Sequence, residues 1–177
     1  MKPWKPKDTV EANPIGLPRE AAERVVRALD PHVASLFVLF HQYQKHHWLV
    51  EGPQYRDLHL FLQGAYEQAH QQADRVAERI TALGGIPTSS PVEQAKIAYV
   101  EHEAEGSFRI RGALELDLRH EGRIAEQLRE SVRLAQQQGD FGSEHLLKQV
   151  LLETEDRAHH LEHYLGDDSL ERGPQRV

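Results

Sequence analysis

The fold is decided by residues 58–85, which read LHLFLQGAYEQAHQQADRVAERITALGG. Apolar side chains recur in this stretch every three or four residues, the spacing that places them on one face of an α-helix. The members of this stripe are Leu58, Leu62, Ala65, Ala69, Ala73, Val76, Ile80 and Leu83. Gly84-Gly85 and Pro87 follow directly, and glycine and proline commonly end helices. We therefore predict an amphipathic helix over about 54–83.

Helical patterns continue on both sides of this stretch. No proline occurs between residues 92 and 173, and β-branched residues do not alternate as they would in strands. Asp30-Pro31 is interpreted as the N-cap and first residue of a helix, and Ser90-Pro91-Val92-Glu93 as a capping box. We predict helices over about 19–29, 31–50, 111–138 and 143–165, and a short helix over about 91–100.

The expected fold class is all-α, a four-helix bundle formed by residues 18–165. Its second and third long helices are joined by a long crossover with a short extra helix, as in ferritin-like bundles. Residues 1–17 contain three prolines, and we expect them to form a flexible arm. Residues 166–177 have almost no apolar content, and we expect a tail.

Composition excludes several classes of function. The 177 residues contain no cysteine, which excludes disulfides, thiolate metal sites and a thiol nucleophile. The apolar stretch 33–40 is too short to cross a bilayer, and no signal peptide is visible, so we expect no membrane and a cytoplasmic protein. The formal net charge of −7 argues against a general nucleic-acid binder. Twelve histidines make metal binding the first question.

The helix over 54–83 also carries a polar stripe at helical spacing: His59, Gln63, Glu67, His70, Asp74 and Glu78. His59 and Asp74 are 15 residues apart, or roughly 22 Å along a helix. One chain therefore cannot bring both to one metal ion. In two copies paired antiparallel about a two-fold axis, however, His59 lies opposite Glu78 and Gln63 opposite Asp74. We interpret the stripe as two metal sites shared between subunits.

His47 adds a ligand, because the turn at Gly52-Pro53 returns it to the neighbourhood of His59. The expected ligand set is His47, His59, Asp74 and Glu78. Nitrogen and oxygen ligands without a thiolate suit iron, and also zinc or manganese, better than copper(I).

These residues resemble the Dps family of miniferritins, named DNA-binding proteins from starved cells. The resemblance covers about residues 20–165 and rests on fixed spacings: His47-Trp48, Gly52, Tyr55, His59, Asp74-x-x-Ala77-Glu78-Arg79 and Leu83-Gly84-Gly85-x-Pro87. It implies a hollow dodecamer built from two-fold dimers. It further implies a ferroxidase that oxidises Fe(II) with hydrogen peroxide or oxygen, stores Fe(III) mineral and protects against oxidative damage. His47 and His59 would come from one subunit, and Asp74 and Glu78 from its partner.

Gln63 departs from the family, which has an acidic residue there. We hypothesise that His70 replaces the lost carboxylate, giving a three-histidine site at which zinc competes with iron; the alternative is that His70 only hydrogen-bonds Glu67 across the interface. Trp48 either shields the site from reactive oxygen products or is an interface aromatic.

Two rival functions remain. An intra-subunit di-iron site would use Glu67 and His70 with Asp156 and His159. A DNA-compacting shell with little ferroxidase activity would use the basic arm residues Lys2, Lys5 and Lys7. Because acidic residues follow these lysines and each subunit is negative, we do not expect DNA binding.

Two smaller clusters allow two interpretations each. Asp140 and Glu144 either line a pore for incoming iron or cap the last helix. His159, His160 and His163 either bind metal at the surface, or are exposed residues whose positive charge, when protonated, is favourable at the C-terminus of that helix.

Overall fold

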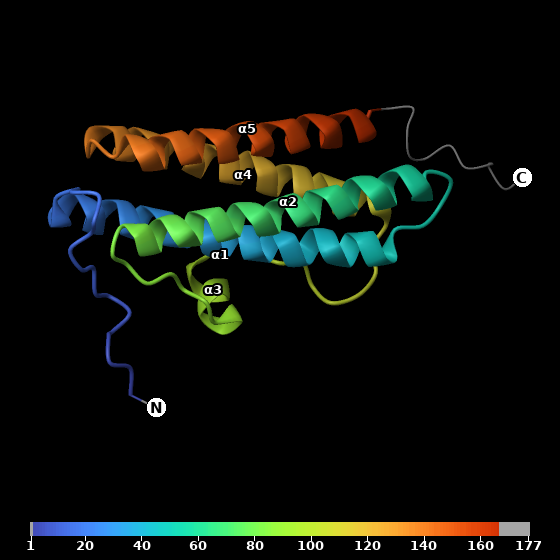
Figure 1. Ribbon diagram of the computed structural model, residues 1–177. Helices are drawn as coiled ribbons and strands as arrows, with labels where there is room; N and C mark the ends of the chain where they lie inside the picture. The colour runs from blue at the N-terminus through green and yellow to red at the C-terminus, as the bar shows by residue number, and fades with distance from the viewer. Residues whose placement is uncertain (1, 167–177) are drawn as a thin grey trace, which may run out of the picture.

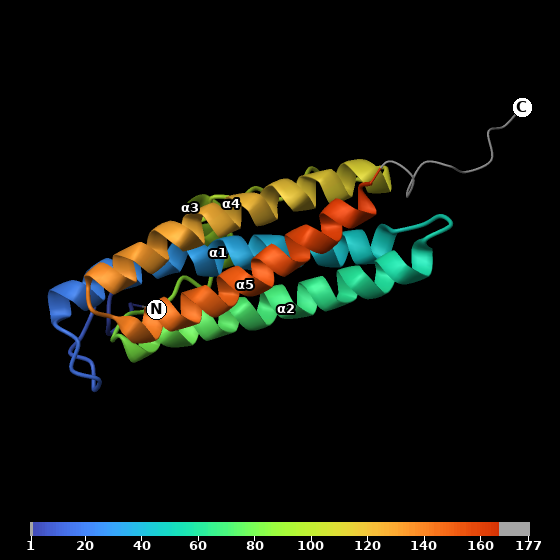
Figure 2. The same cartoon turned by 90° about the horizontal axis from the view of Figure 1, so that it is seen from above.

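The computed structural model describes residues 2–166, which form five helices and no strand. They are α1 (Arg19–Leu49), α2 (Tyr55–Ala82), α3 (Pro91–Ile97), α4 (Ile110–Gln137) and α5 (Phe141–Tyr164). The four long helices lie along one another as a bundle, with α1 beside α2 and α4 beside α5 (Figure 1). α2 and α4 run in the same direction (Figure 2), so residues 83–109 cross the bundle and carry α3. The predicted all-α bundle with an extra crossover helix is confirmed. None of the described helices is long and apolar enough to cross a membrane.

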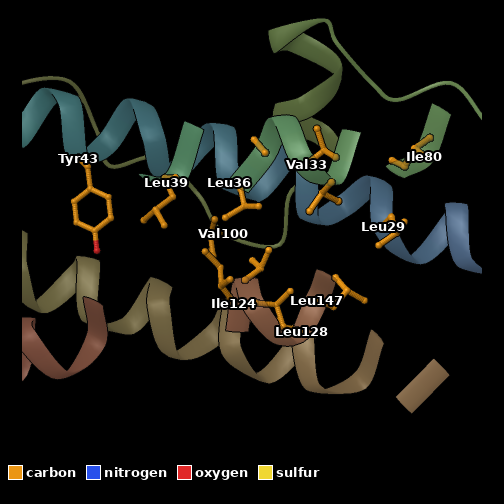
Figure 3. Packing of buried hydrophobic residues seen from close by; sticks show 14 of the residues in the cluster. Leu29, Val33, Leu36, Leu39, Tyr43, Ile80, Val100, Ile124, Leu128 and Leu147 are labelled. Carbon is orange, nitrogen blue, oxygen red and sulfur yellow. The ribbon is translucent and has the colours of Figure 1, made fainter. Parts of the chain in front are cut away.

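The core lies between the two helix pairs (Figure 3). All eight residues of the predicted α2 stripe are buried, and α1 contributes Leu29, Leu36 and Leu39, each fully buried. Ile124 and Leu128 of α4 face them. Burying one such aliphatic side chain stabilises a fold by about 1.5–3 kcal/mol. The apolar stripes therefore determine which helix faces meet, and they leave the polar stripe of α2 on the outside of the bundle.

The predicted break at Asp30-Pro31 is wrong, because α1 continues through Pro31. Proline removes one helical hydrogen bond, but Leu29 and Val33 on either side of it are buried in the core. The Asp30 carboxylate does not cap the helix. It accepts hydrogen bonds from the backbone amide and the hydroxyl of Thr88, each at 2.7 Å. Asp30 thereby ties the crossover segment to α1.

The capping box predicted at the start of α3 is also absent. The Ser90 side chain makes no capping hydrogen bond, and Glu93 instead accepts from Lys96 at 2.7 Å. α3 ends at Ile97, earlier than expected.

The N-terminal arm contacts the bundle at several points, and its expected flexibility stays a prediction. Val10 is buried in the core, and Lys7 donates to Asp30 and to the Ile86 carbonyl. The Glu11 amide donates to the Gly84 carbonyl at 3.0 Å. Gly84 has φ +86°, and a side chain there would collide with the Glu11 carbonyl, so only glycine fits both requirements. The tail predicted over 166–177 lies outside the described residues except for Gly166.

Candidate metal centre

The last turn of α1 and the second turn of α2 bring two predicted ligands together. Gly52, with φ +104°, allows the tight turn between the two helices. The rings of His47 and His59 stack with their centroids 3.7 Å apart and an interplanar angle of 22°. Both side chains are half-buried. The prediction that His47 returns to His59 is confirmed in position.

Each of these two rings is held by the backbone of the other residue. His47 Nδ1 lies 2.9 Å from the His59 carbonyl oxygen, and His59 Nδ1 lies 3.0 Å from the His47 carbonyl oxygen. A carbonyl oxygen only accepts, so each Nδ1 carries the proton and donates it. In the neutral ring this leaves the Nε2 lone pair for a metal ion, the arrangement by which ligating histidines are usually oriented.

Aromatic side chains surround the pair. Tyr55 stacks on His59 at 5.0 Å, and Tyr66 meets the edge of His47 at 5.3 Å between ring centroids. Trp48 follows His47 and is 67% exposed. The His47 and His59 rings are therefore held in place by neighbouring aromatic rings, on a surface where large apolar side chains are also exposed.

Asp74 and Glu78 lie on α2 as predicted, and both are exposed. They are 15 and 19 residues beyond His59 on one continuous helix, so the chain does not bring them to the histidines. No cluster of three or more histidine, aspartate or glutamate side chains able to hold a metal occurs within residues 2–166. One subunit thus presents a pair of histidines and a separate pair of carboxylates.

Gln63, Glu67 and His70 lie between these two pairs on α2. Gln63 Nε2 donates to Glu67 Oε1 at 2.9 Å. The His70 ring instead packs against Phe37 and Phe40 of α1, with centroids 5.9 and 5.2 Å away. His70 is exposed, and within one subunit it is held by aromatic contacts. Its predicted role at the metal remains a proposal.

The interior of the bundle does not fit the rival di-iron site. Glu67, His70, Asp156 and His159 are all exposed and cannot reach the core. At the bundle centre, Arg157 donates to both oxygens of Glu121, at 2.6 and 3.0 Å. A guanidinium that cannot lose its charge occupies the place a metal would need.

This buried pair is joined by the Tyr43 hydroxyl, which donates to Glu121 at 2.6 Å. Burial, followed by the nearby carboxylates, raises the pKa of Tyr43 well above its ordinary value. Our sequence reasoning missed Glu121 and Arg157. The signal was present, because Asp117 and Glu121 fall at helical spacing between Leu114 and Ile124, on the buried face of α4.

A second buried polar group, also missed, lies beside the candidate site. His46 Nδ1 is 2.7 Å from Asp117 Oδ2, and its Nε2 is 3.1 Å from Glu103 Oε1. Burial would lower the pKa of His46, but the hydrogen bond and charge of Asp117, with Glu103, outweigh burial and raise it. Both ring nitrogens of His46 therefore lie against carboxylates inside the protein, whereas Nε2 of the neighbouring His47 is available to bind a metal ion.

Asp140 and Glu144, the candidate pore acids, are engaged within the chain. Asp140 is 3% exposed; its carboxylate caps α5 by accepting from the Ser143 amide and hydroxyl, and it pairs with Arg79 at 2.5 Å. Glu144 pairs with Lys148 at 2.6 Å. The structure thus gives Asp140 the capping role that was the alternative to a pore.

Comparisons with known proteins identify relatives of this chain. The family model described as "Ferritin-like domain" matches residues 26–170. The DNA protection during starvation protein of Halobacterium salinarum is 48% identical over 151 residues, covering 85% of this chain and 83% of that protein. The nutrient stress-induced DNA-binding protein of Nostoc sp. is 37% identical over 161 residues, covering 91% and 88%.

Solved structures give the same picture. The crystal structure of an archaeal Dps homologue from Halobacterium salinarum has a TM-score of 0.92 and 43% identity, covering 96% of this chain and 95% of that one. DpsC from Streptomyces coelicolor also has a TM-score of 0.92, at 27% identity, covering 96% and 99%. The two relatives named above carry DNA binding or DNA protection in their names. The expectation that this chain does not bind DNA therefore finds no support.

Proposed function

Because the chain belongs to the Dps family of ferritin-like proteins, we propose that it oxidises Fe(II) at sites between two subunits. The ferric product would be stored as mineral inside a dodecameric shell. The observation that carries the proposal is the stacked pair His47 and His59, whose Nδ1 atoms are both committed to backbone carbonyls. Both Nε2 atoms are thereby left available for a metal ion, while no carboxylate within residues 2–166 of the same chain completes the site.

A two-fold dimer would complete it. If α2 of two subunits pairs antiparallel, the partner subunit's Asp74 and Glu78 come to His47 and His59, and the same site forms again at the other end. Exposed apolar side chains flank the histidine pair, as expected of a subunit contact. They are Trp48, Leu49, Tyr55 and Leu60.

The ligand set suits the oxidation. Neutral imidazoles accept Fe(II), and the two carboxylates favour the harder Fe(III) product over the Fe(II) substrate. Each ferrous ion gives up one electron and hydrogen peroxide takes up two, so two ferrous ions are consumed per peroxide. Water supplies the remaining oxygen of the ferric oxyhydroxide and releases its protons to solvent. With oxygen as oxidant, four ferrous ions would be consumed for each oxygen molecule reduced to water.

Gln63 and His70 would tune the metal affinity of each inter-subunit site. A neutral amide at position 63 removes one anionic ligand, and a third imidazole from His70 would make the site richer in nitrogen. Zinc accepts such a site well, so we propose that zinc competes with iron there.

Anomalous diffraction at the iron and zinc absorption edges tests the assignment most directly. In crystals grown with Fe(II) or zinc, the peak should lie within about 2.0–2.2 Å of His Nε2 and carboxylate oxygens, with the acids donated by the partner subunit's Asp74 and Glu78. A metal ligated by one subunit alone, or a peak far from His47 and His59, would contradict the proposal.

Protection of DNA, which the name of the Halobacterium salinarum relative states, would follow from the same chemistry. Removing ferrous iron and peroxide together prevents the hydroxyl radical that they form. We propose that this occurs in the cytoplasm, where DNA, iron and peroxide meet.

A further inference from the structure

A second pair of histidines lies on α5, away from the site just proposed. His159 and His163 are one helical turn apart and exposed. Their Nε2 atoms approach each other to 3.2 Å, and their rings meet at 79° with centroids 4.4 Å apart. Both nitrogens thus point into one small volume at the surface.

We propose that His159 and His163 chelate a divalent transition-metal cation such as Zn²⁺ through their two Nε2 atoms. A zinc ion binds imidazole nitrogen at about 2.0–2.1 Å, so two nitrogens on neighbouring positions of one ion lie about 2.9–3.4 Å apart. The observed separation falls inside this range without any rearrangement. Two histidines four residues apart on one helix face are also the spacing by which helices supply zinc ligands.

The surroundings favour a cation at this place. α5 ends at Tyr164, so the pair lies in the last turns, where the helix dipole is negative. The neighbouring His160 is turned away from the pair: its Nδ1 lies 2.8 Å from the Asp156 carbonyl oxygen, and its ring packs near Phe61. Two protein ligands leave the remaining coordination positions to water, so the site would be open to exchange.

This site is independent of the proposed iron oxidation, because neither histidine belongs to α1 or α2. A hydrogen bond between the two rings, with one Nε2 protonated, would give the same separation without any metal. Zinc binding distinguishes the two interpretations, because only the chelate predicts a bound zinc ion that is lost when the two rings are removed.

The test is calorimetric titration of the assembled full-length protein with ZnCl₂, alongside the double variant His159→Ala/His163→Ala. We expect the double variant to bind one fewer zinc per subunit than the wild type, and crystals grown with zinc to show an anomalous peak between the two Nε2 atoms. His145→Ala is the matched control: His145 lies on α5 with Gln149 as its neighbour one turn on, so the helix loses an exposed imidazole but no pair. The control should bind as much zinc as the wild type.

Unchanged zinc stoichiometry in the double variant, with no anomalous peak at the pair, would overturn the proposal. An equal loss of zinc in His145→Ala would also overturn it, because exposed histidines would then bind zinc without pairing. Iron oxidation should be unaffected in all three proteins, which confirms that each is folded and assembled.

Discussion

Gln63 is the residue at which the proposed iron site differs from the pattern that the chain otherwise resembles. It lies one turn from His59 and donates to Glu67. Replacing it with glutamate would return a carboxylate to the proposed iron site. We expect Gln63→Glu to raise the initial rate of Fe(II) oxidation several-fold and to weaken inhibition by zinc, measured by stopped-flow absorbance.

Gln71→Glu is the control for this change, because it adds the same charge to an exposed position of α2 outside the polar stripe. If both variants raised the rate equally, general electrostatic attraction of iron would explain the effect and position 63 would have no special role.

His32 should make the stability of the protein depend on pH. Its ring lies 2.6 Å from the Tyr99 hydroxyl and 2.8 Å from the Ser131 hydroxyl, and burial lowers its pKa from 6.5 to about 4. Between these values the unfolded chain binds a proton that the folded chain does not. The free energy of unfolding should therefore fall as pH falls from 6.5 to 4, by about 3 kcal/mol.

His32→Gln can still hydrogen-bond both neighbours but cannot titrate. Urea unfolding at fixed subunit concentration should show a smaller loss of stability in acid for this variant than for the wild type. The difference in unfolding free energy between the two proteins reports on His32 alone. His46 acts in the opposite direction, because its raised pKa contributes stability at low pH that is lost as pH rises. Parallel pH profiles would contradict the prediction.

The helices owe part of their arrangement to the buried ion pair that joins α4 to α5. Arg157 is buried and engages both oxygens of Glu121. Removing one partner leaves the other charge buried and unpaired, which typically costs 3–5 kcal/mol. We expect Glu121→Gln to lower the free energy of unfolding by about that amount, measured by urea denaturation.

The double variant Glu121→Gln/Arg157→Met should recover much of this loss, because no unpaired charge remains. If the double variant lost as much unfolding free energy as the two single variants lose together, Glu121 and Arg157 would interact less than their geometry indicates.

At the scale of helices, apolar spacing and chain breakers predicted most of the fold. The ends of α2, α4 and α5 lie within two residues of the predicted ones, because glycine and proline end these patterns. The same rules failed at Asp30-Pro31, where a buried face on both sides carried the helix through the proline. Local sequence also could not show that Asp30 binds Thr88, a partner 58 residues away.

For the candidate site, the sequence predicted where the residues lie, and their role as ligands stays a prediction. Helical spacing placed His59, Asp74 and Glu78 on one stripe of α2, and the turn at Gly52 brought His47 to His59. The reciprocal hydrogen bonds to backbone carbonyls were not predictable, since they depend on the angle at which α1 and α2 meet. The capping of α5 by Asp140 was one of two interpretations, and the hydrogen bond from the Ser143 amide, with the ion pair to Arg79, separated them.

For the whole molecule, we expect protection of DNA to follow the metal site. A plasmid exposed to Fe(II) and hydrogen peroxide should remain intact with wild-type protein and be nicked with His59→Ala/Asp74→Asn, as read on an agarose gel. Lys5→Ala/Lys7→Ala changes the arm, where both lysines are already paired with acids, and should still protect. If only the arm variant lost protection, contact between the arm and DNA would matter more for protection than iron oxidation does.

The central claim is that each iron site takes histidines from one subunit and acids from another. Mixed assemblies test it directly: His47→Ala/His59→Ala subunits are co-assembled with Asp74→Asn/Glu78→Gln subunits, each inactive alone. In a mixed dimer one of the two sites regains all four ligands, so a random equal mixture should recover about one quarter of wild-type Fe(II) oxidation. If the mixture were as inactive as its two parents, the ligands would belong to a single subunit and the account would be wrong.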